Sequence, residues 1–159
     1  MGQVDFSRRA LLRGGRDAGL PFPPWALNDF TDRCERCDAC IAACETDILM
    51  RGDGGFPRVD FRRGECTFCG ACAAVCEHGA FSATEGSPWS LRVALAGTCL
   101  AEQGVSCRSC EDVCEPRALC FRLQVGGRAA LQMDIDRCNG CGACISVCPP
   151  GVLHMEEFE

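Results

Sequence analysis

Apolar residues occur along this chain in short stretches, none long enough for an extended helix or a large sheet. Stretches at 57–61, 91–96 and 152–155 predict strands. Those at 119–125 and 129–135 flank Gly126-Gly127 and predict a β-hairpin. The alanine-rich stretch 71–76 predicts a short helix. The pattern therefore predicts an α+β fold of short strands and short helices.

Cysteine dominates the composition, with 17 among 159 residues. Such an excess has two ordinary explanations, disulfides in a secreted protein or metal binding in an intracellular one. Aromatic residues are few and tyrosine is absent, so a large aromatic core is not expected. A chain of this kind needs disulfides or metal to stabilise it. Only the spacing of the cysteines can decide between the two.

The net charge of −6 argues against nucleic acid as a partner. No apolar run approaches the ~20 residues that cross a membrane, so no membrane span is expected. Ser7-Arg8-Arg9 resembles the start of a twin-arginine export signal, but Arg13 to Asp17 replace the apolar stretch that such a signal requires. We therefore expect residues 1–28 to form a basic N-terminal segment of a cytoplasmic protein.

The cysteines form four groups with regular spacing. Three groups have the spacing C-x2-C-x2-C-x3-C, and one has C-x7-C-x2-C-x3-C, which keeps the end of the pattern but stretches its beginning. In chain order the groups are Cys34, Cys37, Cys40 and Cys44; Cys66, Cys69, Cys72 and Cys76; the stretched Cys99, Cys107, Cys110 and Cys114; and Cys138, Cys141, Cys144 and Cys148. Only Cys120 lies outside the four groups.

This spacing is that of bacterial [4Fe–4S] ferredoxins, in which the first three thiolates bind one cluster and the fourth binds the neighbouring cluster. Applied to these four groups, this crossed ligation predicts four clusters. Their ligand sets are Cys34, Cys37, Cys40 and Cys76; Cys66, Cys69, Cys72 and Cys44; Cys99, Cys107, Cys110 and Cys148; and Cys138, Cys141, Cys144 and Cys114. Cys99 has an alternative role as a buried thiol beside an incomplete site.

Two other chemistries fit the spacing less well. Structural zinc favours paired rather than tripled cysteines or mixed Cys/His sets, and only His78 and His154 are available here. A disulfide scaffold needs an oxidising compartment. Cys120 is expected to fill a small apolar position. Four cysteines per cluster leave no iron open to a substrate, so we expect electron or cluster transfer rather than an enzyme.

The repeat suggests two rounds of duplication, the first giving a module with two cysteine groups and the second giving two such modules. The first two groups predict one dicluster 4Fe-4S ferredoxin-type module at 29–88, and the last two predict a second at 89–159, which together make tandem ferredoxin-like modules. The turn-rich stretch 84–88 is the expected junction.

Several further segments resemble the ferredoxin-type NapF proteins of periplasmic nitrate reductase systems. They are 5–12, Pro23-Pro24-Trp25, Cys37-Asp38-Ala39-Cys40, 107–116 and 138–144. The resemblance implies a cytoplasmic accessory protein that contacts the catalytic subunit of periplasmic nitrate reductase before export. It implies a role in maturation, by supplying or reducing the [4Fe–4S] cluster of that subunit. The alternative is a general electron-transfer ferredoxin, or an electron-transfer subunit of a larger oxidoreductase.

Overall fold

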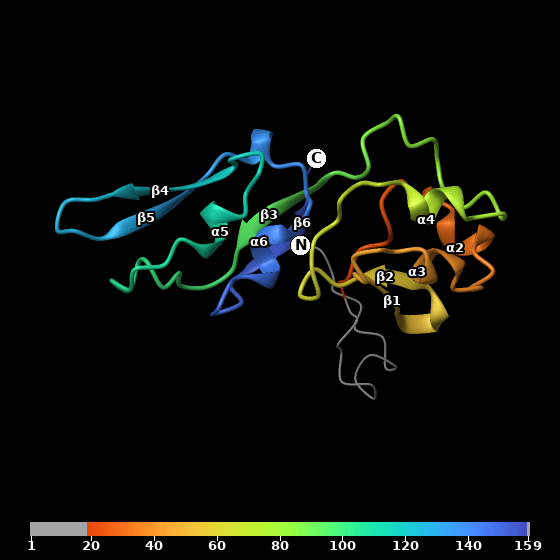
Figure 1. The fold of residues 1–159 in the computed structure, drawn as a ribbon, viewed down its shortest axis with the longest axis horizontal. Coiled ribbons are helices and arrows are strands. Elements are labelled where there is room, and N and C mark those ends of the chain that lie inside the picture. The colour runs from red at the N-terminus through yellow and green to blue at the C-terminus, as the bar shows by residue number, and fades with distance from the viewer. Residues whose placement is uncertain (1–18, 159) are drawn as a thin grey trace, which may run out of the picture.

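The computed structural model describes residues 19–158 (Figure 1). Within this range every helix is a single turn, and the strands have three to five residues. The α-helices are α2 (Phe30–Arg33), α3 (Ala39–Ala42), α4 (Ala71–Ala74), α5 (Ser109–Asp112) and α6 (Ala143–Ser146), and the 3-10 turns are η1 (Asp53–Gly55) and η2 (Ile135–Arg137). The strands are β1 (Leu49–Arg51), β2 (Pro57–Val59), β3 (Leu91–Leu95), β4 (Leu119–Leu123), β5 (Ala129–Met133) and β6 (Leu153–Glu157).

The strands form three separate two-stranded antiparallel sheets, β1–β2, β3–β6 and β4–β5. Leu49 pairs with Val59 in the first sheet, Val93 with Met155 in the second, and Phe121 with Leu131 in the third. In Figure 1 the β4–β5 hairpin extends at one end of the molecule, β1 and β2 lie towards the other end, and β3, β6 and α6 lie between them.

The predicted strands and the hairpin are confirmed, with small shifts in their bounds. At the hairpin turn, Gly127 N–H donates to Gln124 C=O at 3.1 Å, and Gly126 and Gly127 both have positive φ. Strand β1 was not predicted. The helix predicted over 71–76 ends at Ala74.

Cysteines and short apolar side chains share two buried clusters. One cluster contains Ile48, Val59 and Phe61, and the other contains Val93, Leu119 and Leu153. Leu91 and the partly buried Trp89, Ile145 and Met155, all beyond the predicted junction, pack with the first cluster. The two halves of the chain are therefore in contact through their cores.

Residues 19–28 pack against the first half of the chain. Trp25 is 5% exposed, its N–H donates to Pro88 C=O at 2.7 Å, and its Nε1 donates to Gly86 C=O at 3.0 Å. The module boundaries at 28 and 88 stay predictions. The twin-arginine-like stretch and Arg8, Arg9, Arg13 and Arg16 lie outside the described residues. No helix within 19–158 has both the length and the apolar character needed to cross a membrane.

Candidate iron–sulfur sites

The four cysteine groups share a backbone conformation after their last cysteine. The residue three positions later has positive φ in every case: 54° at Asp47, 62° at Gly79, 54° at Arg117 and 63° at Gly151. Two of these four residues are not glycine, so sequence alone would not have found the repeat. The stretched group therefore ends with the same turn as the three regular groups.

The beginnings of the groups differ in the way that their spacing suggests. In the three regular groups, the residues before and after the second cysteine both have positive φ, and the second of them precedes a one-turn helix. These pairs are Arg36 and Asp38 before α3, Phe68 and Gly70 before α4, and Gly140 and Gly142 before α6. Arg108 occupies the equivalent position before α5 with φ −135°.

Three of the four predicted ligand sets each line one cavity. Cys34, Cys37, Cys40 and Cys76 line a cavity with about 350 Å³ of empty space, together with Phe30, Ala80 and Phe81. Cys114, Cys138, Cys141 and Cys144 line another of about 290 Å³, bordered by Val93 and Leu119. In both cavities the fourth cysteine comes from the other group of the same half of the chain.

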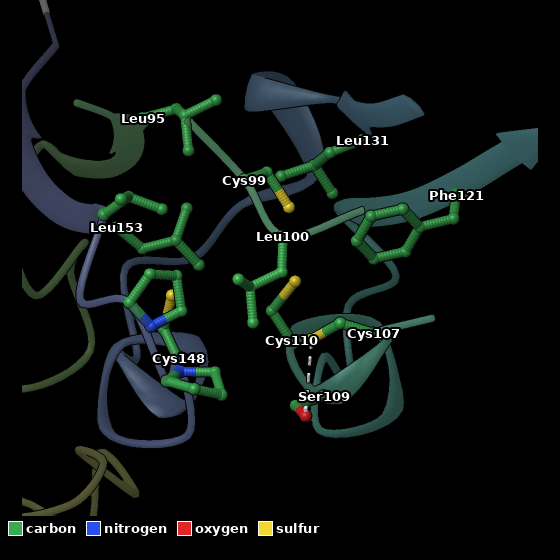
Figure 2. Close-up of a pocket in the computed structure, with 13 residues that line it drawn as sticks. Leu95, Cys99, Leu100, Cys107, Ser109, Cys110, Phe121, Leu131, Cys148 and Leu153 are labelled. Carbon is green, nitrogen blue, oxygen red and sulfur yellow. Dashed lines mark hydrogen bonds between the residues drawn. The ribbon is translucent and has the colours of Figure 1, made fainter. Parts of the chain in front are cut away.

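The stretched group lines the third cavity, of about 320 Å³, with Cys148 as the fourth cysteine (Figure 2). Cys99 is 8% exposed and lies with Cys107 and Cys110 among Leu95, Phe121, Leu131 and Leu153. The longer, seven-residue spacing therefore does not remove Cys99 from the other cysteines, since the turns over 99–105 fold back onto themselves through the bond from Val105 N–H to Leu100 C=O.

The second set is recognised by the effect of its thiols on one another's pKa. Burial, together with the charges of Cys66, Cys69 and Cys44, raises the pKa of Cys72 to about 11. Burial, Cys44 and Cys69 likewise raise the pKa of Cys66 to about 11. The structure thus brings three of the predicted sets together in cavities and places members of the second set near one another, while the ligation of iron by all sixteen cysteines stays a prediction.

Burial also raises the pKa of thiols in the other three sets. It raises the pKa of Cys40 and Cys110 to about 11 and that of Cys144 to about 12, with neighbouring cysteines as a smaller cause. The pKa of Cys141 is also raised, first by burial and then by the charges of Glu65 and Cys138. A thiol in an apolar cavity is poor at ionising unless a cation compensates its charge. Iron bound at these sites would supply that compensation.

The donor set fits an iron–sulfur cluster better than the two alternatives. All seventeen cysteines, which lie within the described residues, are free thiols. Among residues 19–158, no three His, Cys, Asp or Glu side chains converge closely enough for one metal ion. A cubane takes one thiolate on each of its four irons, and three of the sets bring four cysteines to one cavity. The backbone also supplies a sulfur ligand's usual hydrogen bond, from Ala118 N–H to Cys114 Sγ at 3.2 Å.

The residues outside the cysteine sets are placed as follows. Cys120 is half-buried on β4 rather than fully buried, and it borders an open groove that Cys114 also lines. His78 lines the first cavity. His154 is paired with Glu156 at 2.8 Å. Sequence reasoning missed Trp89, which contacts two cysteine loops; its only sequence signal was an aromatic residue beside the predicted junction.

Comparison with known proteins agrees with this geometry. The sequence matches the 4Fe-4S dicluster domain family twice, at residues 33–80 and 105–152, so each match spans two cysteine groups except for Cys99. The chain also resembles the methylamine utilization ferredoxin-type protein MauM of Methylorubrum extorquens, with 30% identity over 81% of this chain and 68% of that protein.

Stronger similarity extends over almost the whole chain. The ferredoxin-type protein NapF of Escherichia coli K12 is 44% identical over 158 residues, which cover 97% of this chain and 96% of the relative. NapF of Haemophilus influenzae Rd is 43% identical over 86% of this chain and 79% of the relative. The chain is therefore an iron–sulfur protein with two 4Fe-4S dicluster domains, and it belongs to the NapF family of ferredoxin-type proteins.

Proposed function

We propose that the chain holds four [4Fe–4S] clusters on the four crossed cysteine sets described above. The observation that carries this proposal is that each of three sets lines its own apolar cavity, with the fourth cysteine coming from the other group of the same half of the chain. The two modules, placed at 29–88 and 89–159, would each be an α+β ferredoxin-type unit with two clusters. When bound, such clusters supply one-electron oxidation and reduction.

The chemistry of the donor sets limits what the protein does. Each set offers four thiolates, which is the full complement for a cubane, so no iron is left open to a substrate. The chain's residues bind the clusters, exclude water from them through Phe30, Phe121 and Leu153, and donate hydrogen bonds to sulfur. We infer that the protein is not an enzyme with a substrate of its own.

We further propose that the protein acts in the cytoplasm on the catalytic subunit of periplasmic nitrate reductase, before that subunit is exported. It would load or reduce the [4Fe–4S] cluster of the subunit. The similarity to NapF over 97% of the chain supports this role, as does its extension over both halves of the chain. The basic segment 1–28 is proposed to dock the acidic body of the protein on its partner.

The test is a deletion of the gene in its own host. The exported reductase is then purified and its iron and acid-labile sulfide are measured. We expect the reductase to lack part of its cluster, and we expect the wild-type gene and the Cys120→Ala variant to restore it. A Cys72→Ala variant, which loses a buried ligand of the second set, should not. A fully loaded reductase in the deletion strain would refute maturation by cluster loading.

The second candidate is a general electron carrier. It is favoured by the exposure of Cys37 and Cys69, which lets a redox partner approach the first and second sets from solvent. Mixing the loaded protein with a cluster-free reductase separates the two candidates. Maturation by loading moves iron to the reductase, whereas an electron carrier keeps its iron and changes only its oxidation state.

A further inference from the structure

The two halves of the chain meet at two cysteine loops. Cys66 N–H donates a hydrogen bond to Cys141 C=O at 2.8 Å. Cys66 belongs to the second ligand set and Cys141 to the fourth, and the two residues lie in separate matches of the dicluster domain. A direct backbone bond between ligand loops of different modules leaves no room for side chains or solvent between them at this point.

The rings of Trp89, Phe61 and Phe68 pack together beside this bond. The ring of Trp89 lies edge-on to Phe61, with centroids 5.7 Å apart, and to Phe68, with centroids 5.9 Å apart. Phe68 lies between Cys66 and Cys69 in the loop of the second set. Trp89 thus connects the core of the first half to a ligand loop of the same half.

The rings of Trp89 and Phe61 also lie against the loop of the fourth set. A Cβ atom at Gly140 would lie 2.6 Å from Leu91 C=O and 2.5 Å from Trp89 Nε1. A Cβ atom at Gly142 would overlap the ring of Phe61. The absence of side chains at Gly140 and Gly142 is therefore what lets the loop holding Cys141 approach Phe61 and Trp89 this closely.

Trp89 also carries a free donor at this place. Its Nε1 is buried and has no hydrogen-bond partner among the described residues. A buried donor without an acceptor is costly in a folded protein.

Contacts within each half complete a continuous series. Helix α3, which holds Cys40, contacts α4, which holds Cys72, and this connects the first set to the second. Helix α5, which holds Cys110, contacts α6, which holds Cys144, and this connects the third set to the fourth. With the Cys66–Cys141 bond, the sets follow one another in the spatial order first, second, fourth, third.

We propose that Phe61 and Trp89 are positioning residues that hold the loops of Cys66 and Cys141 in contact, and that electrons cross between the two halves of the chain at this contact. One electron moves at a time: one side of the contact is oxidised by one electron, the other is reduced by one, and no atom is transferred. Electron tunnelling falls steeply with distance, so the closest approach of the two loops is the favoured crossing point. The inference rests on the electron-handling role proposed above.

The test uses the full chain with only the second and fourth sites intact. Cys34→Ala with Cys37→Ala, and Cys99→Ala with Cys107→Ala, remove two ligands from each of the other sites. The protein is purified without oxygen, its iron is counted, and dithionite reduces it for electron paramagnetic resonance. We expect a spin–spin interaction between the two remaining reduced centres, since the contact places them side by side.

Trp89→Leu and Phe61→Leu are then introduced separately into this chain. Each should weaken the spin–spin interaction at unchanged iron content. Trp89→Phe should keep the interaction, because it retains a ring between the loops. The matched control is Trp25→Phe, since Trp25 also contacts Phe68, at 6.4 Å between centroids, but packs on the first half.

An unchanged interaction in both leucine variants would overturn the proposal, as would its absence from the parent chain with both sites loaded. If the leucine variants lose iron as well as the spin–spin interaction, the contact has only a structural role, and this result also counts against the proposal. If the four-alanine chain fails to hold two clusters, the same variants are compared in the wild-type chain. There, only the leucine variants should narrow the electron paramagnetic resonance spectrum, which combines the signals of all reduced clusters. Full iron without any reduction by dithionite would instead refute electron handling.

Discussion

The hydroxyl Oγ1 of Thr46 lies 3.6 Å from Sγ of Cys44, within hydrogen-bond reach of the sulfur. Although burial raises the pKa of Cys44, hydrogen bonds outweigh it and lower the pKa overall. The donors are the Thr46 hydroxyl and the backbone N–H groups of Leu49, Ile48 and Thr46. The surroundings of Cys44 thus favour the thiolate, whereas those of Cys66 and Cys72 in the same set favour the thiol. Hydrogen bonds to a ligating sulfur also raise the reduction potential of a cluster, because they stabilise the added negative charge.

Thr46→Val removes that side-chain donor and keeps the shape of the residue. We expect the reduction potential of one cluster to fall by tens of millivolts, since about 59 mV corresponds to a tenfold change in a one-electron equilibrium. A redox titration followed by electron paramagnetic resonance measures the reduction potential of each cluster. Thr31→Val on the exposed face of α2 is the matched control and should leave every potential unchanged. An equal shift in both variants would show that the Cys44–Thr46 contact is not the cause.

The stretched group can be tested by comparing two cysteines. The wild-type chain should hold about sixteen irons, four for each of four [4Fe–4S] clusters. Cys99→Ala should reduce iron to about twelve, because Cys99 lines the same cavity as Cys107, Cys110 and Cys148. Cys120→Ala should leave the iron content unchanged, since Cys120 belongs to none of the four sets. Anaerobic purification followed by iron and sulfide analysis gives both numbers. Full iron in the Cys99→Ala chain would show that Cys99 is only a buried thiol.

The cysteine groups and the hairpin could be predicted because their signals are local. Gly126-Gly127 has the positive φ that a tight turn needs, and the cysteine intervals fix which thiols can reach one another. The positive φ values of Arg36, Asp38 and Arg117 were not predictable, because side chains of these types usually avoid that region. They adopt it here within the cysteine loops, whose repeat imposes the same conformation on glycine and non-glycine residues alike.

The contact between the halves could not be predicted for a different reason. It depends on Phe61 and Trp89 meeting Gly140 and Gly142, residues that are between 51 and 81 positions apart in the chain. No periodicity or motif within either half specifies such a contact. The sequence placed a junction at 84–88, whereas the structure shows that Leu91, beyond it, is buried with the first core.

Acid should promote cluster loss. Burial raises the pKa of Cys66 and Cys72 to about 11 and that of Cys144 to about 12, so these thiols are protonated in the cluster-free fold at neutral pH. Iron must displace those protons, and a lower pH therefore favours the cluster-free form. We expect the visible absorbance, recorded anaerobically with a chelator, to decline as pH falls from about 8 to about 5. Retention that improves towards acid would contradict the prediction.

The cluster-free chain should respond to pH in the opposite direction. Its buried thiols have a pKa above the ordinary value of 9.0, so the folded state keeps protons that the unfolded state releases. The free energy of unfolding is then highest below pH 9 and is lost as pH rises towards about 11. Urea unfolding of the iron-stripped, reduced chain, followed by circular dichroism, measures this. A free energy of unfolding that stays constant through this pH window would show that the thiols are not buried without iron.

The turn after the last cysteine of each group should also control stability. Gly151 has φ 63°, and no atom lies within 4 Å of the place that a Cβ would occupy, so Gly151→Ala introduces backbone strain without a clash. That strain costs about 1 kcal/mol, since the left-handed region is unfavourable for any residue with a Cβ. Arg117 occupies the equivalent turn of the stretched group at φ 54°, so Arg117→Gly should relieve strain and be neutral or stabilising.

Gly86→Ala is the matched control for these two variants. Its nearest neighbour is the carbonyl of Ala83 at 3.9 Å, and its φ lies outside the left-handed region, so an alanine fits. Urea midpoints of cluster absorbance, measured without oxygen, should be lower than wild type for Gly151→Ala only. If Gly86→Ala lowers the midpoint as much, the cost comes from losing any glycine. If neither does, the repeated turn is not required to hold the fourth cysteine in place.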